Sequence, residues 1–170
     1  LGSLAPATLS SAAINPSFLL RHPHLPIVYC VNEISGSDDA GRVSWFELNR
    51  DRSCVFAGEM ASGGEDPCHL AINRQASLLA VSNYSSGSLS LIAVNSDGSL
   101  DKPLYIQSHA DRWLKRMNRK ARNRVRQQAA HVHSTLFSDD GQSLFIADLG
   151  SDEWLCQKIS ARGQLHQPLI

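Results

Sequence analysis

The 170-residue chain has no run of 18 apolar residues, a formal net charge of zero, and only four cysteines. Without a long apolar run, no membrane span is indicated. Cys30, Cys54, Cys68 and Cys156 show no paired close spacing, and Cys30 and Cys156 stand within apolar runs. Buried free thiols in a reducing compartment are therefore favoured over disulfides. We expect a cytoplasmic protein.

Although the net charge of the chain is zero, one segment is strongly basic. Residues 112–126 hold eight of the sixteen Lys and Arg residues and no acid. A solvated loop is one interpretation, and a patch that binds phosphate backbones is another. Because only Trp113 offers a stacking ring there and the rest of the chain is acidic, we expect no nucleic-acid partner. The basic residues are Arg112, Lys115, Arg116, Arg119, Lys120, Arg122, Arg124 and Arg126.

One pattern of β-rich runs occurs three times. In the central copy, residues 69–72, 78–81 and 88–94 are separated by polar turns. The second run of each copy ends at Asn32, Asn83 or Asp148, which lie 51 and 65 residues apart. Repeats of about 50 residues with four strands are typical of β-propellers, which normally need at least four blades to close. The sequence predicts an all-β fold, a propeller fragment of about three four-stranded blades.

The expected organisation is a single partial propeller domain over residues 1–170. Because three blades leave strand edges unpaired, we expect the missing blades in cis or from a second chain. The first residue is Leu1, which suggests a truncated start. Within the insertion, residues 113–125 predict one or two turns of helix, with Trp113, Met117 and Ala121 on one side. The expected parts are an outer strand of a preceding blade at 1–10, blades at 15–60 and 66–108, a basic insertion at 109–130, and an incomplete blade at 131–170.

The pair His131 and His133 is the sharpest chemical signal. Residues two apart in an extended strand point to the same face, so the two imidazoles are expected side by side. Such a pair is compatible with a metal site, with packing, or with general acid–base catalysis, because imidazole changes charge near neutral pH. Zinc needs three or four ligands, and the further candidates His69, Asp148 and Glu33 come from different repeats. We therefore expect no metal and no cofactor.

The repeat alignment extends this signal. His69 aligns with Phe18 and Ser134, and Cys68 aligns with Ser17 and His133, at the start of successive innermost strands. In a propeller those starts surround one mouth of the central channel. Asn83 and Asp148 at the ends of second strands either cap turns or contribute to this site. Glu33 replaces Tyr84 and Leu149 at the equivalent position, so the repeat itself does not require a carboxylate there.

Seven phrases together resemble the seven-bladed propeller lactonase family, typified by the propeller-type 6-phosphogluconolactonase, and they also look similar to fungal carboxy-cis,cis-muconate cyclases. The resemblance covers nearly the whole chain from about Asn15. Three departures are Ala130 where the family usually has proline, the longer basic loop, and a length about half that of a full member. The phrases are Asn-Pro-Ser-Phe-Leu at 15–19, Val-Asn-Glu at 31–33, Ser-Gly-Gly-x-x-Pro-Cys-His at 62–69, Ser-Asn-Tyr-x-x-Gly-Ser at 82–88, Arg-Gln at 126–127, His-x-His-Ser at 131–134 and Ala-Asp-Leu-Gly at 147–150.

The resemblance implies a pocket at the channel mouth that hydrolyses a phosphosugar lactone. Lactone hydrolysis needs a base that activates water and a donor for the oxyanion. His133 or Glu33 is expected as the base, and His69 or His131 as the oxyanion donor. The alternatives are a non-catalytic interaction module that uses the basic insertion, and an inactive fragment. The residues expected to bind the substrate are Arg126, Gln127, Asn83 and Asp148.

Overall fold

The computed structural model of the chain describes residues 6–7, 9–36, 41–117 and 123–160. Two four-stranded antiparallel sheets come first, and each follows the order of the chain. The first sheet contains β1 (Pro16–Arg21), β2 (Ile27–Asn32), β3 (Arg42–Leu48) and β4 (Cys54–Ala61). The second sheet contains β5 (Pro67–Ile72), β6 (Leu78–Asn83), β7 (Ser88–Val94) and β8 (Leu100–Ser108).

A short helix separates the second sheet from the third. The helix α1 (Ala110–Arg116) follows β8 directly. The third sheet has three strands among the described residues, in the order β9, β10, β11. These strands are β9 (Val132–Phe137), β10 (Ser143–Asp148) and β11 (Glu153–Lys158).

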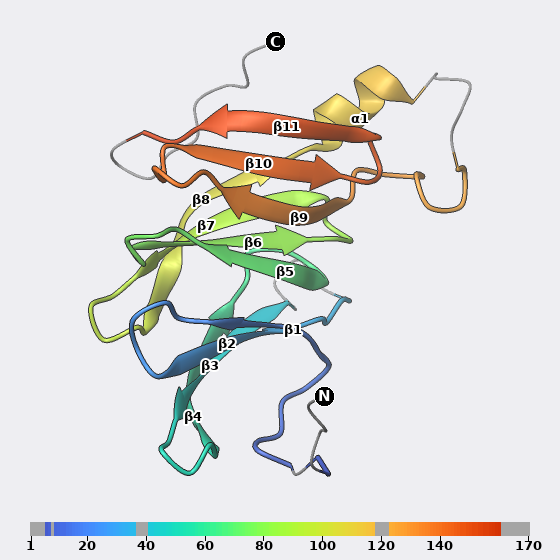
Figure 1. The fold of residues 1–170 in the computed structure, drawn as a ribbon. Coiled ribbons are helices and arrows are strands. Elements are labelled where there is room, and N and C mark those ends of the chain that lie inside the picture. The colour runs from blue at the N-terminus through green and yellow to red at the C-terminus, as the bar shows by residue number, and fades with distance from the viewer. Residues whose placement is uncertain (1–5, 8, 37–40, 118–122, 161–170) are drawn as a thin grey trace, which may run out of the picture.

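The three sheets lie face to face in chain order, with β1, β5 and β9 along one side (Figure 1). The strand β5 contacts both β1 and β9, which makes these three strands the innermost of their sheets. Apolar side chains fill both gaps between sheets. Ile27, Tyr29, Val31 and Val43 pack against Leu70, Leu79, Val81 and Ile92 in the first gap. Ala71, Ala80, Leu89 and Leu91 pack against Val132, Phe137, Leu144, Ile146 and Leu155 in the second.

Burial along the second strands follows from this stacking. In β6, five consecutive residues are buried, because Leu79 faces the first sheet and Ala80 faces the third. In β10, buried residues alternate with half-buried ones, because only one face packs on the second sheet. Side chains of a strand alternate between faces, so the other face of the third sheet is open. We call this the open face; it carries Leu136, Phe145, Ala147, Trp154 and Cys156.

The prediction of an all-β propeller fragment is confirmed, with local corrections. The helix begins at Ala110 and ends at Arg116, so the expected start at Trp113 is wrong by three residues. Cys156 is exposed, because it lies on the open face, whereas Cys30 is buried. All four cysteines are free. The expected outer strand at 1–10 falls largely outside the described residues, and the fourth strand expected beyond residue 160 and Ala121 fall entirely outside them.

Candidate active site at the mouth of the propeller

Antiparallel pairing brings the starts of β1, β5 and β9 to the same end of the sheets as the ends of β2, β6 and β10. We call this end the mouth. Each innermost strand begins with a β-bulge, in which one extra residue has no direct partner on the neighbouring strand. These extra residues are Ser17, Cys68 and His133. Bulges often re-aim side chains next to active sites.

The strand registers confirm the alignment of the three copies. Phe18 pairs with Val31, His69 with Ser82, and Ser134 with Ala147. The residue after each second strand makes the same backbone hydrogen bond in every copy. The amides of Glu33, Tyr84 and Leu149 donate to the carbonyls of Asn15, Asp66 and His131 at 3.0, 2.9 and 2.9 Å.

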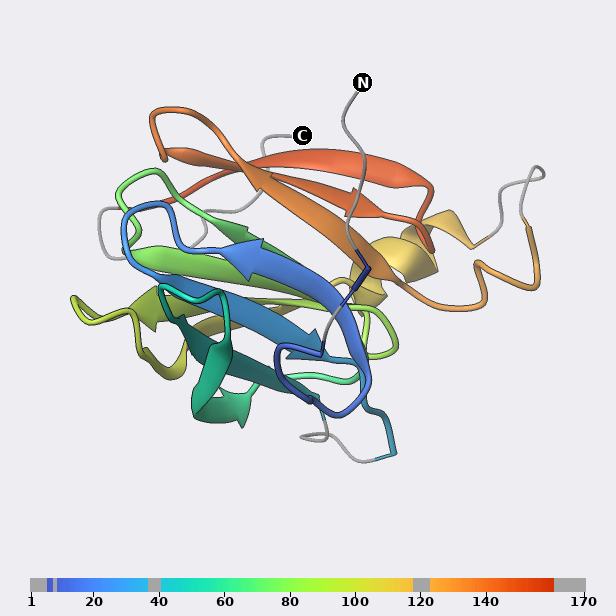
Figure 2. The ribbon, with the colours of Figure 1, turned by 60° about the horizontal axis from the view of Figure 1, so that its bottom comes forward.

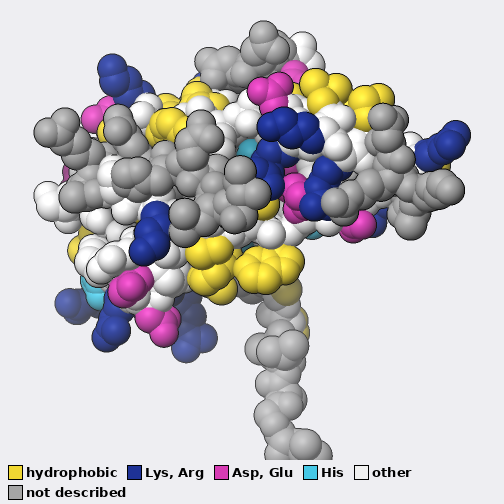
Figure 3. All heavy atoms as spheres, turned by 90° about the horizontal axis from the view of Figure 1, so that it is seen from above, with side chains coloured by type: hydrophobic (Ala, Val, Ile, Leu, Met, Phe, Trp, Pro, Cys, Tyr) yellow, Lys and Arg dark blue, Asp and Glu magenta, His cyan; other side chains and the backbone are white. Residues whose placement is uncertain are grey.

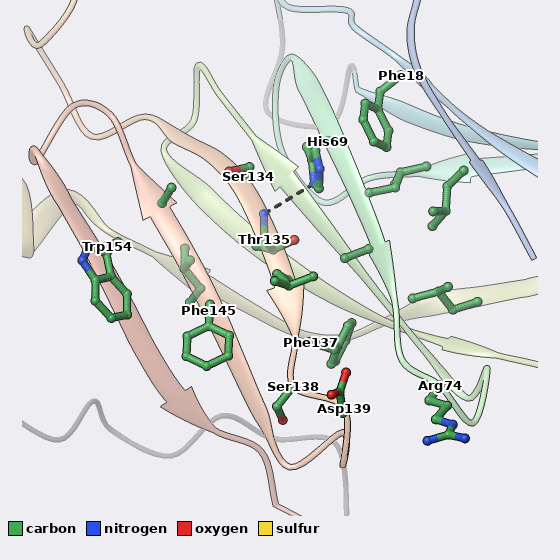
Figure 4. A pocket seen from close by; sticks show the side chains of 17 residues that line it. Phe18, His69, Arg74, Ser134, Thr135, Phe137, Ser138, Asp139, Phe145 and Trp154 are labelled. Atoms are coloured by element: carbon green, nitrogen blue, oxygen red, sulfur yellow. Dashed lines mark hydrogen bonds between the residues drawn. The ribbon is translucent and has the colours of Figure 1, made fainter. Parts of the chain in front are cut away.

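His69 is half-buried between the first and third sheets (Figure 4). Its ring centroid lies 4.3 Å from that of Phe18, and its Nδ1 accepts a long 3.4 Å hydrogen bond from the Thr135 amide. Burial lowers the pKa of His69, and His133 lowers it further. The ring is therefore favoured in its neutral form. Because Nδ1 accepts this hydrogen bond, the proton of the neutral ring sits on Nε2, which makes Nε2 a donor.

His131 and His133 contact the same tyrosine but differ in exposure. The His131 ring stacks on Tyr84 with centroids 4.2 Å apart, and His133 meets Tyr84 edge-on at 5.8 Å. His131 is only 4% exposed, whereas His133 is exposed. The expectation that the two imidazoles lie side by side on one face of a strand is therefore wrong. The strand β9 starts only at Val132, and the bulge at His133 breaks the alternation of side chains.

The hydrogen bond of His131 fixes its tautomer. Its Nδ1 lies 3.0 Å from the Tyr84 carbonyl, which can only accept, so Nδ1 carries the proton. The buried Nε2 has no hydrogen-bond partner among the described residues. A neutral His131 therefore has a lone pair at Nε2 and cannot donate there to an oxyanion.

Cys68 lies against the start of β9, within the electrostatic reach of Glu33. Its Sγ is 3.4 Å from the His133 carbonyl, and the Glu33 carboxylate is close enough to act on the thiol. Burial raises the pKa of Cys68 to about 12, and Glu33 adds to the rise. The thiolate is the nucleophilic form of cysteine, so Cys68 stays an inert thiol near neutral pH. The structure thus brings Glu33, His69 and His133 together around Cys68.

Asp148 is buried in a network that supports this site. Its Oδ2 lies 2.9 Å from Nδ1 of His109, and its Oδ1 accepts the amides of His131 and Ser151, both at 3.0 Å. Burial raises the pKa of Asp148, but these hydrogen bonds outweigh burial and hold the pKa below its usual value. Because both carboxylate oxygens of Asp148 have hydrogen-bond partners within the chain, this residue holds the backbone at His131 in place.

Asn83 and Gln127 have intramolecular partners as well. The buried Asn83 amide donates to Ser88 and Ser90 at 3.3 and 3.1 Å. Asn32 contacts the equivalent Ser44, so this contact belongs to the repeat. Gln127 donates to the Leu149 carbonyl at 3.0 Å and accepts the Asn123 amide at 2.8 Å.

Arg126 is exposed at the end of the insertion. Among the described residues, no hydrogen bond or ion pair joins its guanidinium to Glu33, His69 or His133. The structure therefore places Arg126 beside Gln127 in the chain, without bringing it into the cluster around Cys68.

A groove of about 880 Å³ runs from His69 along the inner strands toward Arg74 and Asp139 (Figure 4). Phe18, Phe137 and Phe145 are among the side chains that line it, and Trp154 of the open face lies at its edge. Within the described ranges, no three His, Cys, Asp or Glu side chains are grouped so that they could hold a metal ion. No helix in the same ranges is long and apolar enough to cross a membrane.

Sequence reasoning missed three residues of this site. Tyr84 contacts both histidines, Cys68 lies at the centre of the cluster, and His109 anchors Asp148. The alignment of Cys68 with His133 and of Tyr84 with Glu33 could have indicated the first two. The contact between His109 and Asp148 joins residues 39 apart, which no local pattern reveals.

Comparisons with known proteins agree with this geometry. Residues 1–169 match the family described as "Lactonase, 7-bladed beta-propeller". The 6-phosphogluconolactonase of Formosa agariphila is 32% identical over 140 residues, which cover 82% of this chain and 37% of that protein. The 6-phosphogluconolactonase of Bacillus subtilis is 23% identical over 158 residues, which cover 92% of this chain and 42% of that protein.

A solved structure shows the same fold with related sequence. The periplasmic gluconolactonase PpgL of Pseudomonas aeruginosa superposes with a TM-score of 0.74 at 28% identity, over 87% of this chain and 40% of that one. This chain thus spans about two fifths of the length of these relatives. With its repeated sheets, its bulged inner strands and this match, the chain belongs to the seven-bladed β-propeller lactonase family.

Proposed function

We propose that the protein carrying this chain hydrolyses a sugar lactone, most closely 6-phosphogluconolactone to 6-phosphogluconate in the pentose phosphate pathway. The observation that carries the proposal is the grouping of Glu33, His69 and His133 around Cys68, from three different sheets. The family match and the names of the relatives support the reaction class.

Each histidine of the mouth fits a different role. His69 presents its Nε2–H as a neutral donor, which suits the oxyanion formed when water attacks the lactone carbonyl. His133 is exposed and is a base that can take a proton from that water. Glu33 is the alternative base. His131 is held as an acceptor, so its part is to pack Tyr84 against His133.

Substrate binding is proposed to use residues outside the cluster around Cys68. Arg126 can hold an anionic group through its guanidinium fork, with Gln127 beside it. Asn83 and Asp148 act from behind the site, because the Asn83 amide holds Ser88 and Ser90 and the Asp148 carboxylate holds the His131 amide. Further blades, in cis or from a second chain, are proposed to complete the pocket. We also propose a cytoplasmic location, which the four free cysteines support.

The test measures hydrolysis by the intact protein that contains these residues. Purified protein is assayed on 6-phosphogluconolactone with and without a chelator, beside the variants Glu33→Gln and Arg126→Ala. We expect turnover that the chelator does not change, a fall in kcat for Glu33→Gln if it is the base, and a rise in KM for Arg126→Ala. Absence of turnover on 6-phosphogluconolactone and on neutral lactones alike would overturn the proposal.

A further inference from the structure

Tyr84 lies at the mouth, between segments of the second and third sheets. It follows β6 directly, and the turn after β6 lies at the same end of the sheets as the start of β9 (Figures 1 and 2). The two segments are in close contact, because a Cβ on Gly87 in that turn would lie 2.5 Å from the carbonyl oxygen of Ala130. The Tyr84 side chain thus meets the residues with which the third sheet begins.

Both the backbone and the ring of Tyr84 are held in place. The Tyr84 amide donates to the Asp66 carbonyl at 2.9 Å, and the Tyr84 carbonyl accepts a hydrogen bond from Nδ1 of His131 at 3.0 Å. The same His131 ring stacks on the Tyr84 ring, with an angle of 10° between the two planes. His131 is itself buried, and its amide donates to Asp148. The Tyr84 ring is therefore a fixed surface at the mouth.

The ring of His133 has few other restraints. It is exposed, and among the residues that the structure describes it forms no hydrogen bond and no ion pair. Arg112 and Arg116 pair with Glu153, and in the view from above Lys and Arg side chains lie beside Asp and Glu side chains (Figure 3). The His133 ring meets Tyr84 at an angle of 82°, close to the edge-to-face arrangement that aromatic pairs prefer. This contact is therefore the restraint that the structure shows on the direction of the imidazole.

An aromatic ring at position 84 is not a requirement of the repeat. Glu33, Tyr84 and Leu149 occupy equivalent positions, and the amide of each makes the same backbone hydrogen bond. The three sheets thus accept a carboxylate, an aromatic ring and an aliphatic side chain at this place. The needs of the fold alone do not explain the ring, which points to a role in the site.

We propose that Tyr84 is a positioning residue whose ring orients His133 for general-base catalysis, a role that rests on the proposed function. A general base acts only when its lone pair points at the proton of the attacking water, within hydrogen-bond reach. An exposed side chain otherwise divides its time among staggered rotamers. A fixed ring against His133 raises the fraction of molecules in the productive geometry, and this acts on kcat rather than on KM. The Tyr84 hydroxyl has no part in this role.

The experiment compares three variants of the intact protein. Tyr84→Leu removes the ring and introduces the side chain that the third sheet carries at position 149, whereas Tyr84→Phe keeps the ring and removes the hydroxyl. Tyr105→Leu is the matched control, because Tyr105 is also half-buried but lies on β8 and packs against the core between the second and third sheets. For each protein, kcat and KM are measured on 6-phosphogluconolactone, and the thermal unfolding midpoint is recorded.

We expect Tyr84→Leu to lower kcat by about tenfold to 10²-fold with little change in KM, because misplacing a catalytic group by about 1 Å has an effect of that size. Tyr84→Phe should keep most of the activity, and Tyr105→Leu should lower the unfolding midpoint but not kcat. Full kcat in Tyr84→Leu would overturn the proposal. A large loss in Tyr84→Phe would overturn it as well, whether or not Tyr84→Leu folds, because the hydroxyl would then be the acting group.

Proton NMR of the His133 ring tests the contact without turnover. The His133 signals are identified by their loss in His133→Gln, and a neighbouring aromatic ring displaces them from the values of a free imidazole. Tyr84→Leu should bring them back toward those values, whereas Tyr84→Phe should not. If this pattern appears in a protein that hydrolyses no lactone, the orientation of His133 by Tyr84 is supported and the proposed function is not. If lactones are hydrolysed but Tyr84→Leu leaves the signals unchanged, the proposed function stands and Tyr84 does not orient His133.

Discussion

At the scale of single residues, the partners of three histidines decide what each ring can do. His69 accepts a hydrogen bond from a backbone amide at Nδ1, His131 donates to a carbonyl from Nδ1, and the exposed His133 ring meets Tyr84 edge-on. In the sequence, nothing distinguishes the protonation of these three imidazoles. Their proton positions follow from contacts with residues 66 and 47 positions away, which no sequence pattern supplies.

The donor role of His69 predicts a graded response to substitution. Because Gln keeps an N–H group and Leu has none, His69→Leu should lower kcat by about 10²- to 10³-fold and His69→Gln by less. KM should change little in either variant, since the oxyanion forms only during the reaction. Steady-state kinetics on 6-phosphogluconolactone checks this. Equal losses in the two variants would argue against an oxyanion donor at this position.

His22 links stability to pH through a turn far from the mouth. Its buried Nδ1 accepts the amides of His24 and Leu25 at 3.1 and 2.9 Å. Burial lowers the pKa of His22 from 6.5, and the neighbouring His24 lowers it further. Because the folded protein binds the proton less well than the unfolded chain, this stabilisation is complete above pH 6.5 and is lost as the pH falls through the folded-state pKa.

His22→Ala should therefore lower the free energy of unfolding by about 2 kcal/mol near pH 7.5, because two backbone amides lose their acceptor. The loss should be smaller at pH 5. Denaturant unfolding at both pH values measures it. A penalty for His22→Ala that is larger at pH 5 would contradict the assignment.

At the scale of elements, the site depends on short segments that pass between sheets. A Cβ on Gly150 would lie 1.8 Å from the carbonyl oxygen of Ala129 and 2.8 Å from the His131 nitrogen. Both contacts are with backbone, which cannot rotate away as a side chain can. The glycine therefore lets the segment that leads into β9 run against the turn between β10 and β11.

Gly150→Ala should displace that segment and with it His131 and His133. We expect a loss of about 1–3 kcal/mol in unfolding free energy and a clear fall in kcat/KM. Gly36→Ala, whose added Cβ would meet no atom within 4 Å at a φ of +114°, measures the cost of an unfavourable backbone conformation without a close contact, the converse of Gly150→Ala. Unchanged stability and activity in Gly150→Ala would show that the close approach does not exist in solution.

The elements themselves were largely predictable, because their signals are local. The second strands and their closing residues Asn32, Asn83 and Asp148 follow from β-rich runs that end in polar turns. The helix start was missed, since Ala110 continues β8 almost without a break and His109 lacks a side-chain cap. The bulges at Cys68 and His133 could not be predicted, because a bulge is a property of the register between two strands.

At the scale of the whole molecule, comparison of the three sheets indicates that a further blade covers the open face. Trp154 occupies the position that Leu89 and Val43 hold in the other sheets, where both are fully buried. In this chain Trp154 is 73% exposed. If a further blade packs there, as we propose, the indole becomes part of a third apolar layer.

Trp154→Ala should then lower the unfolding free energy of the intact protein by about 3–5 kcal/mol, the usual cost of removing a buried aromatic side chain. Leu104→Ala, at a site 51% exposed on β8, should cost far less. Chemical denaturation of both variants makes the comparison. Similar small losses would mean that no further blade covers the open face.

The central claim is that side chains from three repeated sheets form one catalytic cluster at the mouth. Its most direct test is kcat/KM on 6-phosphogluconolactone for His133→Ala against His24→Ala in the intact protein, where His24 is an exposed histidine in the turn between β1 and β2. The account predicts a loss of at least about 10²-fold for His133→Ala, as expected when a general base is removed, and less than about twofold for His24→Ala. Full activity in the double variant His133→Ala with Glu33→Gln would contradict the central claim.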